Sequence, residues 1–356
     1  MNNAISILQS DAINLLKILI ATPSFSKEED NSSAIIKQFL EKHHVKPDQF
    51  LYNVWAKNKY FDPGKPTILL NSHHDTVKPN KGYTLDPFSP LEKDGKLFGL
   101  GSNDAGGCLV SLLASFLFFY DKENLKYNII IAATAEEEIS GHNGIEVLLP
   151  LVGKIDGAIV GEPTQMQMAV AEKGLMVLDC TATGRAGHAA REEGDNAIYK
   201  AIKDIEWFNT YKFDKVSDLL GPVKMSVTVI ETENKAHNVI PSQCKFVVDC
   251  RVNELYSFEE MLDIIRSNVR SDVSPRSTRL RSSSIPLDHP LVKAGSKLGR
   301  TYYGSPTTSD KALMVFPALK IGPGDSARSH TADEYIYIDE IKEGIELYIQ
   351  LLNQLV

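Results

Sequence analysis

Short, almost wholly apolar segments alternate with helix-like periods through the first half of the chain. Apolar runs over 67–71, 127–134 and 157–161 predict strands that are buried on both faces. The spacing of apolar residues over 13–21 predicts an amphipathic helix that is capped near Ser10. Because helices cover both faces of sheets built from such strands, we expect an α/β domain with a mostly parallel sheet.

A different rhythm begins near residue 175. The pattern predicts a strand over 176–183, a helix over 196–211, strands over 224–231 and 243–252, and a helix over 257–270. Apolar residues alternate with more polar neighbours from Cys244 to Val252, so this sheet should bury one face. These elements indicate a small α+β domain of the ferredoxin-like, β-α-β-β-α-β type.

The remainder of the chain returns to the first pattern. A basic, serine-rich connection over 274–284 leads to a helix-like segment from His289 and to a strand over 315–320. The sequence therefore predicts one catalytic domain, residues 1–174 and 285–356, interrupted by an inserted domain over 175–284.

Composition and charge narrow the classes of partner. The chain has 356 residues, of which 43% are hydrophobic and 24% charged, with a formal net charge of −8. This charge argues against nucleic acid and anionic membranes as partners and favours small molecules. The apolar segment 13–21 is too short to span a bilayer. Cys108, Cys180, Cys244 and Cys250 form no CxxC pair, so we expect buried thiols and a cytoplasmic location.

Polar residues that can bind metal follow the predicted strands. His73 follows the strand 67–71, Glu136 to Glu138 follow the strand 127–134, and Glu162 follows the strand 157–161. In open α/β sheets the ligand crevice lies beyond the carboxyl ends of the strands. A hydrolytic site with two metals needs imidazole and carboxylate ligands and a bridging carboxylate. Five separated residues supply this set: His73, Asp104, Glu138, Glu162 and His330.

Each of these residues taken alone is more often found in a turn or on a solvated surface. Their joint order is specific: His-x-Asp at 73–75, Gly-x-x-Asp-x-x-Gly at 101–107, Glu-Glu at 137–138, Gly-Glu-Pro-Thr at 161–164, Gly-His at 187–188, Asn-Val-Ile-Pro at 238–241, Asp-x-Arg at 249–251, and Gly-Pro-Gly at 322–324 before His330. This order resembles the dizinc aminoacylase and metallopeptidase family of acetylornithine deacetylase and succinyl-diaminopimelate desuccinylase. The resemblance covers nearly the whole chain and implies a zinc-aminopeptidase-like catalytic domain with an inserted dimerisation or lid domain.

The resemblance also implies roles for individual residues. His73, Asp104 and Glu162 would hold one Zn²⁺, and Asp104, Glu138 and His330 the other, with Co²⁺ or Mn²⁺ as alternative metals. Asp75 would orient His73, and Glu137 would act as the general acid and base. His188 would stabilise the oxyanion in the active site of the partner subunit, which implies a homodimer. The residues expected to contact substrate are Asn238, Arg251 and Ser309. A cis peptide bond is expected between Asp104 and Ala105. One departure is Gly106, which stands where many relatives have a lysine.

These roles predict hydrolysis of the amide bond of a small N-acyl amino acid. We expect N-acetylornithine as substrate and a role in arginine biosynthesis; a succinyl group, citrulline, lysine or diaminopimelate stay open, as does a di- or tripeptidase. Two further readings belong to other classes. One is a metal-dependent binding protein without turnover. The other is a dehydrogenase, suggested by Gly99-Leu100-Gly101, although Asp104 stands where the third glycine of that fingerprint belongs.

Overall fold

The structure is a computed structural model that describes residues 2–191 and 193–355. Its contacts divide the chain into two compact units. Unit 1 comprises the chain up to Val170, Ser284–Tyr303, and the chain from Ser309 onward. Unit 2 comprises Ala171–Ser283 and Gly304–Thr308. Each unit has a separate hydrophobic core.

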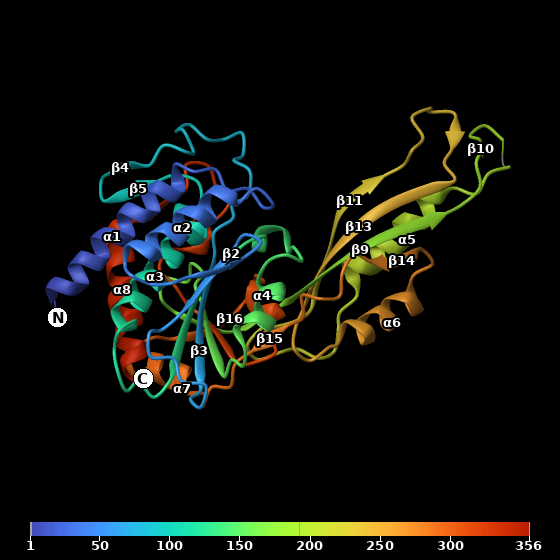
Figure 1. Ribbon diagram of the computed structural model, residues 1–356. Helices are drawn as coiled ribbons and strands as arrows, with labels where there is room; N and C mark the ends of the chain where they lie inside the picture. Colours follow the sequence, from blue (N-terminus) through green and yellow to red (C-terminus); the bar gives the residue numbers. More distant parts are fainter. Residues whose placement is uncertain (1, 192, 356) are drawn as a thin grey trace. The chain divides into compact units, whose positions relative to one another are not determined.

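Unit 1 is built around a mixed sheet whose centre is parallel (Figure 1). The order is β1-β2-β6-β3-β7-β17-β8-β15, and β16 also pairs with β8. The four central strands are β6 (Asn128–Thr134), β3 (Thr67–His73), β7 (Gly157–Val160) and β17 (Ala318–Lys320), and they are mutually parallel. The outer strands are β1 (Asp48–Phe50), β2 (Asn53–Lys57), β8 (Met168–Glu172), β15 (Ser283–Ser284) and β16 (Tyr302–Ser305). The predicted α/β class with a mostly parallel sheet is confirmed.

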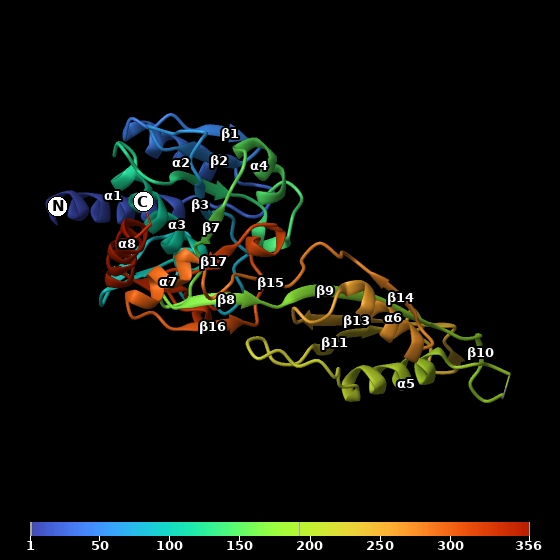
Figure 2. The same cartoon turned by 90° about the horizontal axis from the view of Figure 1, so that it is seen from below.

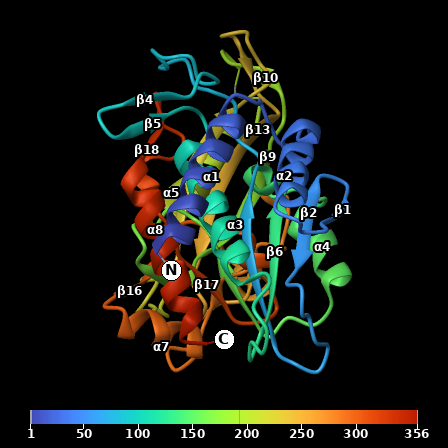
Figure 3. The same cartoon turned by 60° about the vertical axis from the view of Figure 1, so that its left-hand side comes forward.

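The central strands of this sheet are buried on both sides because helices cover both of its faces. Ile68 and Leu70 of β3 face one core, and Leu69 faces the other. The larger core is shared by α1 (Asn2–Ile20), α2 (Asp30–Lys42), α3 (Gly107–Phe119), α7 (Pro290–Lys297) and α8 (Ile338–Asn353). The smaller core includes α4 (Ile145–Val152). Figure 3 shows α1, α3 and α8 gathered beside the sheet.

Helix α3 is apolar on all sides because it is enclosed by other helices and by the sheet. The window Ser102–Phe119 is long and apolar enough to cross a membrane, and 83% of it is buried within the protein. It packs against α1, α8, β3 and β6. Its composition is that of a central core helix.

Two predicted elements begin at different residues than expected. Helix α1 starts at Asn2 and not near Ser10, because Ile5 and Leu8 extend its apolar stripe. Strand β17 begins at Ala318 and not at residue 315. Val315 is 99% exposed, and Pro317 has no N–H to donate to a neighbouring strand.

Unit 2 has the predicted β-α-β-β-α-β order (Figure 2). The elements are β9 (Gly174–Thr183), α5 (Ala197–Thr210), β11 (Lys224–Glu231), β13 (Gln243–Val252), α6 (Phe258–Asn268) and β14 (Asp272–Pro275). The sheet is antiparallel in the order β11-β13-β9-β14. Both helices pack on the face that carries Leu178 and Phe246. The segment 274–284 was expected to be a connection, but its first residues, Ser274 and Pro275, belong to β14.

Smaller elements complete both units. In unit 1, β4 (Leu91–Lys93), β5 (Lys96–Phe98) and β18 (Tyr335–Tyr337) form a three-stranded sheet. Short single-turn segments carry or adjoin site residues: η1 (Ser102–Gly106), η2 (Glu137–Ile139), η3 (Asp310–Leu313) and η4 (Ser326–Arg328), which precedes His330. In unit 2, β10 (Gly187–His188) pairs with β12 (Val239–Ile240). The predicted buried thiols are confirmed, because all four cysteines are free and buried.

Candidate metal centre

The carboxyl ends of the parallel strands bring the predicted ligands of unit 1 together. His73 ends β3 and pairs in register with Thr134, the last residue of β6, which precedes Glu137 and Glu138. Strand β7 lies on the other side of β3 and leads to Glu162. Since the three strands run in the same direction, their following loops open at one edge of the sheet.

Asp104 lies between the two histidines. Its Oδ1 is 3.4 Å from Nε2 of His73, and its Oδ2 is 3.7 Å from Nε2 of His330. Glu138 lies 3.0 Å from Nε2 of His330, and Glu162 lies 3.9 Å from Nε2 of His73. One carboxylate thus faces two imidazoles through its two different oxygens, which is the arrangement that a bridging ligand requires.

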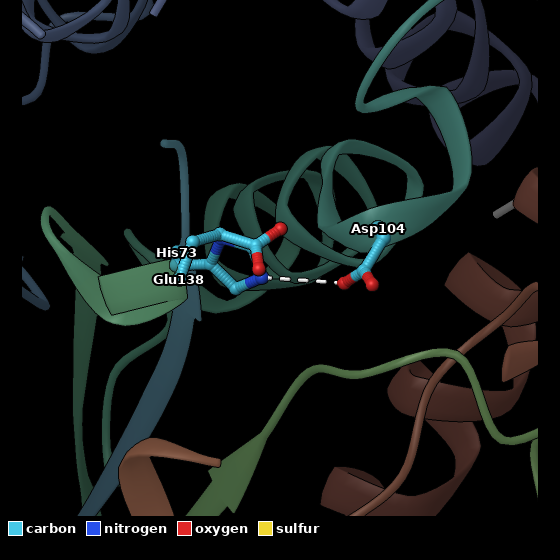
Figure 4. A group of neighbouring side chains, drawn as sticks. All are labelled: His73, Asp104 and Glu138. Carbon is cyan, nitrogen blue, oxygen red and sulfur yellow. Dashed lines mark hydrogen bonds and ion pairs between the residues drawn. The ribbon is translucent and has the colours of Figure 1, made fainter. Parts of the chain in front are cut away.

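Figure 4 shows His73 and Glu138 directed toward Asp104. The ligand atoms of these three residues all lie within 4.8 Å of one another. The same holds for His73, Glu137 and Glu162. The two groups share His73, so the donors form one continuous cluster of imidazole nitrogens and carboxylate oxygens.

Asp75 orients the imidazole ring of His73 through contacts with its Nδ1 atom. The Nδ1 of His73 lies 3.0 Å from the backbone oxygen of Asp75 and 3.4 Å from its carboxylate Oδ1. The backbone carbonyl is therefore the nearer acceptor for the Nδ1–H, which leaves Nε2 facing Asp104. The adjacent His74 has both ring nitrogens engaged, with Ser32 and with the backbone oxygen of Tyr52. Burial lowers the pKa of His74 to about 4, so this histidine is a neutral structural residue.

Buried carboxylates bind three successive N–H groups of the loop that carries Glu137. The N–H of Glu136 donates to Glu29 (3.0 Å), and those of Glu137 and Glu138 donate to Asp75 (3.1 Å each). Glu136 has a positive φ of 55°, which reverses the chain at this point. Its own carboxylate accepts a bond from the Asn143 amide at 2.9 Å. Among the three consecutive glutamates, Glu136 is therefore engaged inside the loop.

Glu137 is half-buried in a strongly acidic environment. Burial raises the pKa of Glu137 well above its usual range, and the charges of Glu162, Asp310 and Glu138 add to the shift while His73 opposes it. Asp310 is 5% exposed, and its Oδ2 accepts bonds from Asn71 (2.9 Å) and Thr134 (2.7 Å). The hydrogen bond that Nε2 of His330 donates to the Glu138 carboxylate raises the pKa of His330 to about 9.

The remaining predicted site residues are carried by other segments of the chain. His188 of β10 is exposed, and its Nδ1 accepts the N–H of Ala190 at 3.1 Å. Asn238 is also exposed, and its backbone oxygen accepts the N–H of Ala189. Arg251 makes a bidentate salt bridge to Asp249 (2.8 and 3.0 Å), the alternative interaction for this arginine. These three belong to unit 2. Ser309, in unit 1, is buried and caps η3.

The predicted cis peptide bond between Asp104 and Ala105 is confirmed. The same loop explains the departure at Gly106. A Cβ atom at this position would lie 2.4 Å from the backbone oxygen of Gly101 and 2.6 Å from Leu16. The loop in this conformation therefore excludes any side chain at residue 106, including the lysine that the resemblance leads one to expect there.

Comparison with known protein families identifies the family of the chain. The family described as peptidase family M20/M25/M40 matches residues 69–354. The chain belongs to this family. Succinyl-diaminopimelate desuccinylase 2 of Ruegeria sp. is 26% identical to this M20 chain, with 96% of the chain and 94% of the relative covered. Acetylornithine deacetylase of Proteus mirabilis is 28% identical, with 96% of each covered.

Solved structures agree in fold. An aminopeptidase of Bacillus cereus has a TM-score of 0.78 at 18% identity, covering 98% of both chains. A tripeptidase of Staphylococcus aureus has a TM-score of 0.78 at 18% identity, covering 97% of both. The solved structures show the M20 fold, and the family match over residues 69–354 shows that the chain is an M20 metallohydrolase.

The donors of unit 1 fit the dinuclear metal site of M20 hydrolases. The fit rests on the two oxygens of Asp104, each directed to a different histidine, and on the adjoining carboxylates of Glu138 and Glu162. Imidazole and carboxylate ligands of this kind suit Zn²⁺, Co²⁺ and Mn²⁺.

Sequence reasoning did not single out Glu29 or Glu334 as parts of the site, and it included Asp310 only as the last residue of a substrate-side segment over 307–310. Glu29 and Glu334 bind backbone N–H groups of the loops that carry Glu137 and Asp104, and Asp310 lies near Glu137. The signal in the sequence is weak, because a glutamate or aspartate in a loop is ordinarily a solvated residue. The position of Asp310 directly after Ser309, and of Glu334 four residues after His330, is the one available hint.

Proposed function

We propose that this chain is a metal-dependent amidohydrolase that removes the N-acyl group from an amino acid, with N-acetylornithine as the first candidate substrate. The observation that carries the proposal is the position of Asp104 between His73 and His330, with Glu137 beside this cluster. The two relatives described above are a desuccinylase and a deacetylase, both of which are named for removing an acyl group.

In this proposal His73, Asp104 and Glu162 hold one metal, and Asp104, Glu138 and His330 hold the other. Two Zn²⁺ ions are the expected cofactors, and when bound they supply Lewis acidity toward water and the amide carbonyl. Asp75 fixes the ring of His73 through its backbone oxygen and carboxylate. It also fixes the loop that carries Glu137 and Glu138.

Glu137 is the proton carrier of the proposed reaction. Its carboxylate takes a proton from the attacking water, the water oxygen adds to the acyl carbon, and the C–N bond breaks as Glu137 delivers the proton to the departing nitrogen. The products are a carboxylic acid and a free amino acid. The raised pKa of Glu137 suits a group that must hold a proton during the second step. Glu136 is less suited, since Asn143 engages its carboxylate.

In this proposal, unit 2 acts as a dimerisation or lid domain. His188 would reach the active site of a partner subunit and stabilise the oxyanion, while Asn238, Arg251 and Ser309 would contact substrate oxygens. A homodimer in the cytoplasm, acting in arginine biosynthesis, follows from this reading. Arg251 would have to exchange its bond to Asp249 for the substrate carboxylate, which an arginine fork also binds well.

A di- or tripeptidase is the second candidate. It is supported by the likeness in fold to an aminopeptidase and a tripeptidase. The two candidates share the hydrolytic centre and differ in the group that is released. The first removes a simple acyl group such as acetyl from an amino acid, and the second removes an amino acid from an unblocked peptide. A metal-binding protein without turnover would keep the ligands while having no need of Glu137.

The test is release of free amine by Zn²⁺-loaded protein, with a chelator-treated sample as control. The substrates are N-acetylornithine, N-succinylornithine, N-acetylcitrulline, succinyl-diaminopimelate and an unblocked dipeptide. Chelator-sensitive release from one acylated amino acid supports the proposal and identifies the acyl group. Release from the dipeptide alone would establish the peptidase instead. No release from any substrate by protein with bound metal would refute both.

A further inference from the structure

Glu334 is a buried carboxylate that binds the backbone of the loop carrying Asp104. It is 1% exposed. Its Oε1 accepts the N–H groups of Asn103 (2.8 Å) and Asp104 (2.9 Å), and its Oε2 accepts that of Gly101 (3.1 Å). Three N–H groups of one loop thus end on a single side chain.

The loop is shaped to receive this carboxylate. Gly101 has a φ of +73°, in the left-handed region, and it directly precedes the single turn η1. Successive N–H groups in such a turn point toward one place and bind an anion there. The backbone oxygen of Glu334 adds a further bond by accepting the N–H of Gly99 at 2.9 Å.

Glu334 also connects two of the candidate ligands. It lies four residues after His330 and directly before β18, which pairs with β5 just upstream of the Asp104 loop. The segment that carries His330 and the loop that carries Asp104 are therefore tied together at Glu334. These two segments bring Oδ2 of Asp104 to 3.7 Å from Nε2 of His330.

We propose that Glu334 is a positioning residue for the metal centre, which holds Asp104 by its backbone N–H so that its two carboxylate oxygens face His73 and His330. The proposal rests on the metal site proposed above. Metal–ligand bonds of about 2.0–2.2 Å leave little room for displacement. A shift of the Asp104 backbone would move both oxygens relative to both histidines at once. Asp75 supports His73 and the glutamate loop, whereas Glu334 supports the bridging residue.

The test compares Glu334→Gln with the wild type in the full-length protein. Glutamine has the size of glutamate but places an NH₂ group against the N–H donors of the loop, so at least one hydrogen bond is lost. Asp333→Asn is the matched control. Asp333 is the preceding residue, and its carboxylate accepts the N–H groups of Thr84 (2.8 Å) and Leu85 (2.9 Å) and the Thr84 hydroxyl (2.5 Å). That loop carries no proposed site residue.

Two readouts besides turnover are used: Zn²⁺ affinity by competition with a chelator, and the visible absorption of the Co²⁺-loaded protein. We expect Glu334→Gln to weaken Zn²⁺ binding by about 10- to 100-fold and to change the Co²⁺ spectrum. At saturating metal, kcat should fall while KM stays near the wild-type value. Asp333→Asn should leave the affinity, the spectrum and kcat unchanged.

Wild-type affinity together with an unchanged Co²⁺ spectrum in folded Glu334→Gln would overturn the proposal. If this variant does not fold, hydrogen exchange in the wild type decides. The amides of Asn103 and Asp104 must be protected in the metal-free protein, and rapid exchange of both would also overturn the proposal. Failure of the proposed function is distinguishable, because it would appear as absent metal binding or absent turnover in the wild type itself.

Discussion

Glu29 is a buried carboxyl group whose ionisation opposes folding. It directly precedes helix α2, is 0% exposed, and accepts the N–H of Glu136 through Oε1. Its Oε2 is buried without a hydrogen-bond partner among the described residues. Burial raises the pKa of Glu29 to about 7, and the charge of Asp75 adds to this shift against the opposing backbone hydrogen bonds. The folded protein therefore favours the neutral acid.

The pKa sets the size and direction of a stability effect. In the unfolded chain the pKa of Glu29 has the ordinary value of 4.5, and in the folded protein it is about 7. Each unit corresponds to about 1.4 kcal/mol, so the full effect is about 3 kcal/mol. Below pH 4.5 both states are protonated and the stability is intact. As the pH rises, the unfolded state releases its proton first, and the stability is progressively lost until the pH exceeds about 7.

Glu29→Gln should remove this dependence, since a glutamine oxygen can still accept the Glu136 N–H. Between about pH 5 and pH 8, the wild type should lose about 2–3 kcal/mol more unfolding free energy than the variant. Urea unfolding of metal-free protein measures this. A Trp207→Phe background lets the fluorescence of Trp55, in the same unit as Glu29, report the transition. The control is Glu28→Gln, at an exposed position. Equal pH slopes for wild type and Glu29→Gln would refute the reasoning.

Three further predictions concern the metal centre. Glu137→Ala should retain bound metal and fold while kcat falls about 10²- to 10⁴-fold, and steady-state kinetics with near-normal kcat would contradict the assignment. Asp75→Asn places an amide against the N–H groups of Glu137 and Glu138, so Zn²⁺ affinity should fall about 10- to 100-fold in chelator competition; unchanged affinity would mean that the carboxylate is dispensable. Gly106→Ala brings a Cβ to 2.4 Å from the oxygen of Gly101 and should lower the unfolding free energy in urea by about 1–3 kcal/mol, with an undiminished value showing that the loop can relax.

Much of the fold could be predicted because its signals are local. Strands β3 and β6 are short apolar runs, and residues buried on both faces of a sheet leave that pattern in the sequence. The alternation in β13 likewise marks a sheet with one covered face. The predicted start of β17 was wrong because two signals in the sequence compete there. At β17 the apolar run continues upstream through Val315, but Pro317 and the exposure of Val315 delay the start of the strand.

The supporting residues of the site could not be predicted in the same way. Glu29 and Glu334 lie 107 and 230 positions from the backbone groups of Glu136 and Asp104 that they bind. Their partners are main-chain N–H groups, which every residue but proline has, so the sequence of the loop does not reveal them. Asp310 similarly meets Asn71 across 239 positions and Thr134 across 176.

The sequence by itself determined which residue types are available as ligands and that His73, Glu138 and Glu162 follow apolar strands. It also determined the two sheet types, because apolar periodicity depends only on neighbouring positions. Only the tertiary structure decided that Oδ1 of Asp104 faces His73 and Oδ2 faces His330. That geometry depends on the register of parallel strands and on the anchoring of the Asp104 loop by Glu334. Both are contacts between segments distant in sequence, whose formation depends on the packing of the whole unit.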